Sequence, residues 1–262
     1  MPFFTVIVVS YNAEDTIKET LTSILSQTFN DYEIIIKDAI SRDHTLELIP
    51  HDSRIKVYSC KDTGIYDGMN QAIDYATGKY ICFMNCGDSF YDNNVLAKIY
   101  QLAKDAKEKT IIYGNYYTKG ETCSITKSIN KSFLYRHPIC HQTMFWSNRL
   151  FDELGKYDIT LKIVSDYDYT LKCFCSNTCF IHSGITVCSY LGDGVSATKK
   201  NKKRLHDENK IVRSRYYSKS EILKYDIKLA LTMPRLRSYL NSDRSPKLLK
   251  RLYIKIANKI NH

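Results

Sequence analysis

Acidic side chains follow two predicted strands and open one predicted helix. Asp38 and Asp88 each come after an apolar, strand-like segment, and Asp166 stands at the start of a helical stretch. Carboxylates are preferred ligands of Mg²⁺ and Mn²⁺, which proteins usually bind through one or two of them together with phosphate oxygens. A carboxylate is also a common general base for a hydroxyl group. These residues predict metal-assisted chemistry on a phosphorylated substrate.

Each of these residues alone also has an ordinary structural explanation, because Asp often caps a helix or a turn at such positions. The functional interpretation requires that they meet beyond the carboxyl ends of one parallel sheet, where α/β proteins bind ligands. The sequence has no Gly-x-x-x-x-Gly-Lys-Ser/Thr and no Gly-x-Gly-x-x-Gly after its first strand. The absence of these motifs argues against P-loop enzymes and dehydrogenases.

The elements that must position these residues alternate along the first half of the chain. Short apolar, β-branched runs predict strands, and apolar residues at helical spacing predict helices. The predicted strands cover residues 3–10, 32–37, 55–58, 79–84 and 110–113, and the predicted helices cover 17–27, 41–49, 65–76 and 93–107. This alternation is typical of an α/β fold whose central sheet is mostly parallel and flanked by helices.

The net charge of +10 is concentrated near the C-terminus. Residues 199–262 hold 19 Lys or Arg against 5 Asp or Glu, whereas residues 1–198 hold 19 against 23. We therefore divide the chain into a ligand-binding and catalytic domain, residues 1–198, and a basic, helical C-terminal region, residues 199–262. Because the basic surplus and the acidic strand ends lie in different parts of the chain, we expect no nucleic-acid partner.

The last part of the basic region has an amphipathic pattern. Its apolar residues fall on one face of a helix, namely Leu248, Leu249, Leu252, Tyr253, Ile256 and Ile260. This pattern predicts either an interfacial helix on an anionic membrane or an ordinary helix packed on the rest of the protein. We find no apolar run of 18 residues and no signal peptide. We therefore expect a cytoplasmic protein, with a peripheral location on the cytoplasmic face of the inner membrane if the tail binds lipid.

The nine cysteines fit a reducing compartment. Their number is odd and they include no Cys-x-x-Cys pair, so their spacing differs from that of common zinc sites. We interpret them as buried thiols that behave as small apolar side chains.

Several short segments together resemble family 2 glycosyltransferases of the GT-A fold, in a subgroup that assembles polysaccharides. The block Gly64-Ile65-Tyr66-Asp67-Gly68-Met69-Asn70 is similar to the subgroup's Gly-Ile-Tyr-Asp-x-Met-Asn. The other similar segments are 8–12, 23–28, 38–45, 76–80, 85–88, 141–142, 165–168 and 192–196. Each segment alone is a weak signal, but their common order over residues 3–217 is specific.

The resemblance implies a nucleotide-sugar donor, a glycan or lipid-linked acceptor, and Mn²⁺ or Mg²⁺ as cofactor. It implies that Asp88 binds the metal and that Asp166 is the catalytic base. The implied donor-binding residues are Ser10, Asn12, Asp38, Asp67, Asn70 and Asn85, and the residues implied on the acceptor or donor side are His141, Gln142, Trp146 and Asp168. Three of these have structural alternatives: Asp67 as solvated helix surface, His141 as a structural histidine, and Trp146 as a core anchor.

The chain departs from the family pattern at three places. Gly87 stands where many members have the first Asp of the metal motif, Ala39-Ile40 replaces a small pair that usually contains Gly, and Ser165 stands where many members have Glu. The first departure puts metal dependence in doubt, and the second concerns the shape of the nucleobase pocket.

We predict an inverting, metal-dependent hexosyl- or N-acetylhexosaminyl-transferase. It would move a sugar from a nucleotide diphosphate donor, with UDP as the expected nucleotide, to a hydroxyl of a capsule, lipopolysaccharide or lipid-linked glycan precursor. The alternative is a non-catalytic nucleotide-sugar-binding partner of a membrane glycan-assembly complex, which Gly87 and the basic tail suggest. A nucleotidyltransferase is a weaker third choice, because its Gly-rich N-terminal phosphate loop is missing. The sequence leaves the sugar, the acceptor, the linkage and the oligomeric state open.

Overall fold

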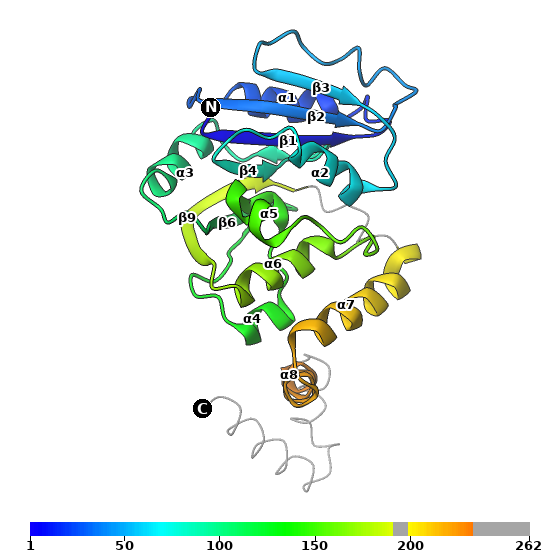
Figure 1. Cartoon of the computed structure of the whole chain (residues 1–262), viewed down its shortest axis with the longest axis vertical. Coiled ribbons are helices and arrows are strands. Elements are labelled where there is room, and N and C mark those ends of the chain that lie inside the picture. The colour runs from blue at the N-terminus through cyan, green and yellow to red at the C-terminus, as the bar shows by residue number, and fades with distance from the viewer. Residues whose placement is uncertain (191–198, 233–262) are drawn as a thin grey trace, which may run out of the picture.

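The structure, a computed structural model, describes residues 1–190 and 199–232 (Figure 1). Within these residues nine strands form one sheet in the order β3-β2-β1-β4-β8-β6-β9-β5, with β7 paired to β6. The strands are β1 (Phe4–Ser10), β2 (Tyr32–Asp38), β3 (Ile55–Ser59), β4 (Tyr80–Phe83), β5 (Ser89–Phe90), β6 (Thr110–Thr118), β7 (Glu121–Cys123), β8 (Met144–Ser147) and β9 (Cys179–Ser189). The helices are α1 (Ile17–Leu25), α2 (Ile65–Ile73), α3 (Val95–Ala103), α4 (Lys131–Arg136), α5 (Asn148–Leu154), α6 (Ser165–Cys175), α7 (Lys202–Tyr216) and α8 (Lys219–Thr232), with 3₁₀ turns η1 (His141–Thr143) and η3 (Lys199–Asn201).

The four strands β3, β2, β1 and β4 run parallel, and their register aligns the ends that matter for the site. Ser10 pairs with Asp38, and Asp38 pairs with Ser59, so three polar residues end neighbouring strands side by side. Farther along the sheet, β8 pairs antiparallel with β4 and with β6, and β6 pairs parallel with β9. The predicted α/β fold is confirmed, with a mixed, mostly parallel central sheet flanked by helices.

Both faces of the sheet are covered by helices. Successive residues of a strand point to opposite faces. Val6 and Val8 of β1 therefore pack in one apolar cluster with α1 and α3, whereas Ile7 packs in the other cluster with α2, α5 and α6. Burial on both faces explains why β1 and β2 read as continuous apolar runs rather than as alternating ones.

The segment 41–49 forms a series of turns and not the predicted short helix. The Asp43 carboxylate accepts hydrogen bonds from the backbone N–H groups of Glu14 (3.1 Å) and Thr45 (3.1 Å), and Thr45 Oγ1 accepts one from Ala13 N–H (2.7 Å). Such side chains satisfy backbone groups locally and compete with helical hydrogen bonds. The segment thereby ties the chain after β2 to the chain after β1.

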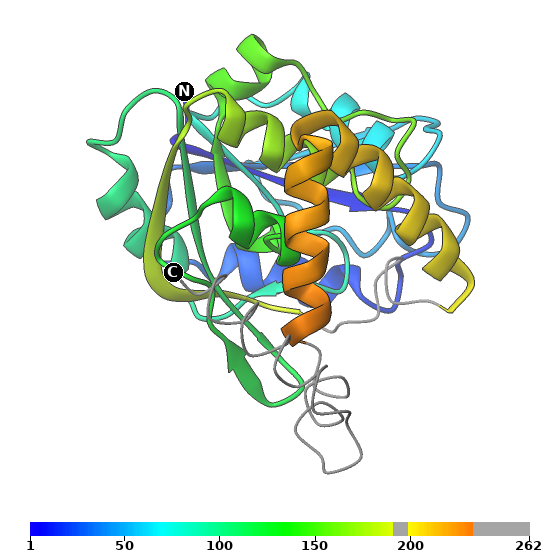
Figure 2. The ribbon, with the colours of Figure 1, turned by 90° about the horizontal axis from the view of Figure 1, so that it is seen from below.

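The helix α7 is packed into the body of the molecule. It runs beside α6, and α8 crosses beneath the other described helices (Figures 1 and 2). Val212 of α7 is fully buried and Tyr217 is 5% exposed, both in the apolar cluster that also covers the sheet. None of the described helices is long and apolar enough to cross a membrane. The family-like segment 192–196 and the predicted amphipathic tail helix lie outside the described residues.

Candidate functional site

Asp38 ends β2 within a ring of serine groups. Its fully buried carboxylate accepts hydrogen bonds from Ser10 Oγ (3.0 Å), Ser59 Oγ (3.1 Å) and Ser41 N–H (2.8 Å), and the Ser41 hydroxyl also donates to it. Burial would raise the pKa of Asp38, but these hydrogen bonds outweigh it and hold the pKa below its ordinary value. These hydrogen bonds join the ends of β1 and β3 and the turn after β2 to Asp38. The contact of Asp38 with the nucleobase stays a prediction.

Asn12 lies exposed on the turn after β1. Its φ of 47° is in the left-handed region, which Asn tolerates better than most residues. Its side-chain oxygen accepts a hydrogen bond from Arg42 N–H (2.9 Å), and its own N–H donates to Ser41 Oγ (2.9 Å). Asn12 therefore holds the turn after β2 against the end of β1, which is the edge predicted for the nucleotide.

Asp88 follows β4 and is 7% exposed. One carboxylate oxygen, Oδ2, accepts a hydrogen bond from Gln142 Nε2 (2.8 Å). Burial raises the pKa of Asp88, and the Gln142 hydrogen bond offsets part of this. Burial, followed by the charges of Asp88 and Asp38, also raises the pKa of the Cys86 thiol to about 12.

Asp166 is the second residue of α6 and accepts three hydrogen bonds. Oδ1 lies 2.8 Å from the Tyr66 hydroxyl and 2.9 Å from Tyr167 N, and Oδ2 lies 3.1 Å from His141 Nδ1. Burial would raise the pKa of Asp166, but His141 and then Tyr66 hold it below its ordinary value. The carboxylate therefore stays ionised, which is the form that accepts a proton.

A single 3₁₀ turn joins the two acidic groups. In η1, His141 binds Asp166 and the next residue, Gln142, binds Asp88. The side chains of His141 and Asp166 are 15% and 20% exposed, so this pair remains accessible from solvent. The buried carboxylate of Asp88 and the accessible, ionised carboxylate of Asp166 are thus held in one frame, meaning that adjacent residues of η1 bind both of them at the carboxyl edge of the sheet.

Oxygen atoms suited to Mg²⁺ or Mn²⁺ stand at the end of β4. Asn85 Oδ1 is buried without a hydrogen-bond partner among the described residues, while the amide nitrogen lies 3.2 Å from His141 Nε2. An unpartnered buried oxygen is costly, and a hard cation would supply its partner. Asn85 Oδ1 and the carboxylate of Asp88, three positions later in the sequence, are the kind of oxygen ligands that bind a divalent cation together with phosphate oxygens. In residues 1–190 and 199–232 no group of three or more His, Cys, Asp or Glu could hold a metal by itself.

Other predicted site residues are committed to structural contacts. The Asn70 amide donates to Tyr157 C=O (2.9 Å) and accepts from Tyr157 N–H (3.0 Å). Asp67 accepts a hydrogen bond from Thr63 N–H (2.7 Å) at the start of α2. Trp146 is fully buried in the core of the sheet. The role implied for Trp146 on the acceptor or donor side does not fit this burial, and its alternative as a core anchor applies.

Asp168 also faces away from solvent. It is 3% exposed, and its carboxylate lies 2.8 Å from Arg215 Nη1 of α7. Its helical position, two residues after Asp166, turns it toward α7 and away from the shared frame of η1.

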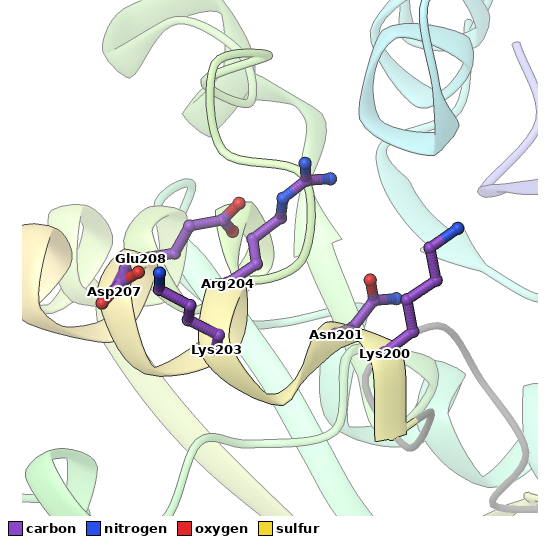
Figure 3. A pocket seen from close by; sticks show the side chains of 6 residues that line it. All are labelled: Lys200, Asn201, Lys203, Arg204, Asp207 and Glu208. Carbon is purple, nitrogen blue, oxygen red and sulfur yellow. The ribbon is translucent and has the colours of Figure 1, made fainter.

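Two residues of the site were missed in the sequence. Tyr66 belongs to the block noted for Asp67 and Asn70, and its place in that block was the available signal. Glu208 has no comparable signal, because it is one carboxylate in a strongly basic stretch. Figure 3 shows it beside a surface hollow at the start of α7, lined by Lys200, Asn201, Lys203, Arg204, Asp207 and Glu208.

Comparisons with known sequences show the family of the chain. The family described as Glycosyl transferase family 2 matches residues 5–167. A PGL/p-HBAD biosynthesis glycosyltransferase of Mycobacterium tuberculosis is 28% identical over 197 residues, which are 72% of this chain and 77% of the relative. The Escherichia coli enzyme WfaP, a UDP-Glc:alpha-D-GlcNAc-diphosphoundecaprenol beta-1,3-glucosyltransferase, is 30% identical over 181 residues, or 65% of this chain and 69% of WfaP.

Solved structures share the fold. The crystal structure of S. aureus TarS 1–349 aligns with a TM-score of 0.68 and 16% identity over 99% of this chain and 80% of that one. The mannosyltransferase PcManGT of Pyrobaculum calidifontis, in complex with GDP-Man and Mn²⁺, aligns with a TM-score of 0.60 and 17% identity over 99% and 87%. With the family match covering more than half of the sequence, the chain belongs to glycosyl transferase family 2 and is a nucleotide-sugar glycosyltransferase of the GT-A fold.

Proposed function

We propose that this chain is an inverting glycosyltransferase that moves a sugar from a UDP donor to a hydroxyl of a lipid-linked precursor of a bacterial surface polysaccharide. One observation carries the proposal: the turn η1 places the ionised Asp166 and the buried Asp88 in one frame through His141 and Gln142. A transfer of this kind needs a base for the acceptor and a group that counters the charge of the leaving diphosphate.

Asp166 is the base in this proposal. It takes the proton of the acceptor hydroxyl, and the oxygen attacks the anomeric carbon on the face opposite the diphosphate. The bond between the anomeric carbon and the phosphate oxygen breaks, and its electron pair leaves with UDP. The lowered pKa of Asp166, caused by His141 and Tyr66 against the effect of burial, keeps it ionised at neutral pH.

Asn85 and Asp88 would hold Mn²⁺ or Mg²⁺, which when bound neutralises negative charge on the diphosphate. The complex of PcManGT with Mn²⁺ and its donor supports this cofactor by analogy of fold. The turns that follow β1 and β2, joined by the hydrogen bond from Arg42 N–H to Asn12, would receive the nucleoside at the ends of these strands, next to Asp38.

The relatives support the choice of donor and acceptor. WfaP is named for a UDP-glucose donor and a diphosphoundecaprenol-linked acceptor. TarS has been solved with UDP-GlcNAc. A UDP-hexose or UDP-N-acetylhexosamine and a lipid-diphosphate glycan are therefore the first donor and acceptor to test.

The proposal includes a peripheral contact with an anionic membrane surface. On α8, Leu223 is 63% exposed and Ile227, one turn later, is 40% exposed, with the exposed Lys224 beside them. Exposed apolar groups flanked by lysines fit the headgroup region of a bilayer. Binding to phosphatidylglycerol vesicles, absent with phosphatidylcholine, should weaken on deletion of residues 245–262 and further with Leu223→Ser. Equal co-sedimentation of all variants with phosphatidylglycerol vesicles would contradict the proposed membrane contact.

The catalytic test uses two variants and one control. Asp166→Asn should keep UDP binding and lower the rate of transfer by about 10²–10⁴-fold, the usual contribution of a general base. Asp88→Ala should lose the Mn²⁺-dependent part of donor binding. Asp105→Asn, an exposed carboxylate just after α3, serves as the control and should match the wild type. Retained transfer by the Asp166 variant would show that another group is the base.

The alternative of a non-catalytic nucleotide-sugar-binding partner remains tied to Gly87, which replaces the first Asp of the usual metal motif. A wild-type protein that binds UDP but neither hydrolyses nor transfers any donor, over a panel of donors and acceptors with Mn²⁺ or Mg²⁺, would establish this alternative. EDTA should abolish turnover under the main proposal, and Mn²⁺ should restore it.

A further inference from the structure

Glu208 of α7 holds the chain just before the proposed base. Its Oε1 accepts a hydrogen bond from Lys162 N–H (3.0 Å), and its Oε2 accepts from Ile163 N–H (2.8 Å) and Val164 N–H (3.3 Å). The side chain is 6% exposed. A buried carboxylate with three N–H donors is firmly held, and its negative charge also suits the amino-terminal end of α6.

The peptide fixed by Glu208 contacts the base through Tyr66. The carbonyl of Ile163 lies 2.8 Å from the Tyr66 hydroxyl, and the same hydroxyl lies 2.8 Å from Asp166 Oδ1. Tyr66 is 6% exposed, so protein atoms cover most of it. A continuous path therefore runs from Glu208 through the Ile163 peptide and Tyr66 to Asp166.

The Tyr66 hydroxyl has one hydrogen and two acceptors. When Asp166 is ionised, the hydroxyl donates to the carboxylate and lowers its pKa. After Asp166 has taken a proton, its own O–H can donate to the Tyr66 oxygen, and the Tyr66 hydrogen can turn to the Ile163 carbonyl. The contact is thus kept in both protonation states, provided that the Ile163 carbonyl stays where Glu208 holds it.

Helix α7 contacts α6 at a second place, through Arg215. Arg215 Nη1 lies 2.8 Å from Asp168 Oδ1, and Arg215 Nη2 lies 2.8 Å from Asp158 Oδ2. Asp168 is nearly buried, with 5% of its side chain exposed in this pair. The first turn of α6 is therefore fixed by α7 on both sides of Asp166, at the preceding backbone and at the following side chain.

We propose that Glu208 and Tyr66 are positioning residues that hold Asp166 in its catalytic orientation, so that a helix of the basic C-terminal region completes the active site. This inference rests on the proposed role of Asp166 as base. It predicts a change in the chemical step and not in donor binding, because neither residue lies at the strand ends proposed for the nucleotide.

Glu208→Gln tests the path without removing volume, and Asp207→Asn, the exposed neighbour on the same helix, is its matched control. On folded protein, we expect Glu208→Gln to lower kcat at least 10-fold with the Kd for UDP unchanged within twofold. Tyr66→Phe should lower kcat and also move the acid limb of the kcat–pH profile to higher pH, since the hydrogen bond that favours the ionised base is lost. The control should match the wild type in both readouts.

Three outcomes would overturn the inference. The first is wild-type kcat in folded Glu208→Gln and Tyr66→Phe. The second is a parallel loss of kcat and UDP affinity with an unchanged pH profile, which would indicate a merely structural role. The third is retained transfer in Asp166→Asn, which would overturn the proposed base as well. Loss of transfer in Asp166→Asn with wild-type behaviour of the other two variants would leave the proposed function standing and remove this inference alone.

Discussion

At the scale of single residues, the ionisation of Asp166 depends on His141. The pKa of Asp166 is lowered from 3.8 despite burial, so its stabilising contribution is present above pH 3.8 and is lost as the pH falls through its folded pKa. The pKa of His141 is raised from 6.5 despite burial, so its contribution is complete below pH 6.5 and is lost as the pH rises through its folded pKa. The pair contributes most between these two values.

Removal of the His141 charge should shift the pH dependence of transfer. In His141→Gln, Asp166 loses its largest favourable contact while its burial remains, so its pKa rises. We expect the acid limb of the kcat–pH profile to move to higher pH, measured by UDP release. His44→Gln is the control, because His44 is exposed and pairs with Glu47 away from this site. An unmoved acid limb would show that the pair does not set the ionisation of the base.

Ile40 has a strained backbone conformation beside the strand ends proposed to bind the nucleotide. Its φ is 60°, a left-handed conformation that costs a non-glycine residue about 1–2 kcal/mol, and its side chain is 44% exposed. Ile40→Gly should raise the free energy of unfolding by about 1 kcal/mol and Tm by about 2–4 °C. Ala39→Gly, whose φ is not positive, should lower stability instead. A Tm for Ile40→Gly at or below that of the wild type would contradict the strain.

At the scale of elements, a buried lysine joins β2 to the loop before α2. Lys37 Nζ donates to Cys60 C=O (2.7 Å), Asp38 C=O (3.0 Å) and Asp62 Oδ2 (3.0 Å). Its side chain is fully buried, and that of Asp62 is 10% exposed. The loop that leads to Tyr66 is therefore positioned by an interior ion pair.

Breaking this pair should cost much more than breaking a surface pair. Lys37→Met removes the cation and leaves Asp62 uncompensated, so we expect a loss of about 3–5 kcal/mol in urea unfolding. Lys98→Met is the comparison variant, since both side chains of the Lys98–Asp92 pair are exposed, at 45% and 37%. Its loss should stay below about 1 kcal/mol. Equal losses in the free energy of unfolding would mean that the Lys37–Asp62 pair does not hold this loop in place.

At the scale of the whole molecule, α7 shares its core with the sheet-bearing part of the chain. Val212 and Tyr217 belong to the larger apolar cluster, and Glu208 satisfies three backbone N–H groups before α6. A division of the chain after residue 198 separates α7 from a core that it helps to form. We propose that the catalytic unit extends through α7, and the charge asymmetry then describes the surface of that helix and the residues after it.

Truncation checks this extension. A chain that ends after residue 198 loses two buried side chains, at about 1.5–3 kcal/mol each, and the three hydrogen bonds to Glu208, at about 0.5–1.5 kcal/mol each because water replaces the carboxylate. That sum is comparable to the whole stability of a typical domain, so we expect no cooperative unfolding transition. A chain that ends after residue 232 should keep the wild-type transition and UDP affinity. Cooperative folding of the shorter chain would restore the division at residue 198.

The sequence by itself determined the α/β fold, the succession of the first strands along the chain, and the positions of Asp38, Asp88 and Asp166 at strand and helix ends. These features follow from local periodicity, which burial on one or two faces imposes on neighbouring residues. Only the tertiary structure decided what surrounds each carboxylate. The Tyr66 hydroxyl meets Asp166 across 100 positions and Ile163 across 97, and Glu208 meets Ile163 across 45. Hydrogen-bond saturation and desolvation depend on side chains brought together from distant segments, and no local pattern records them.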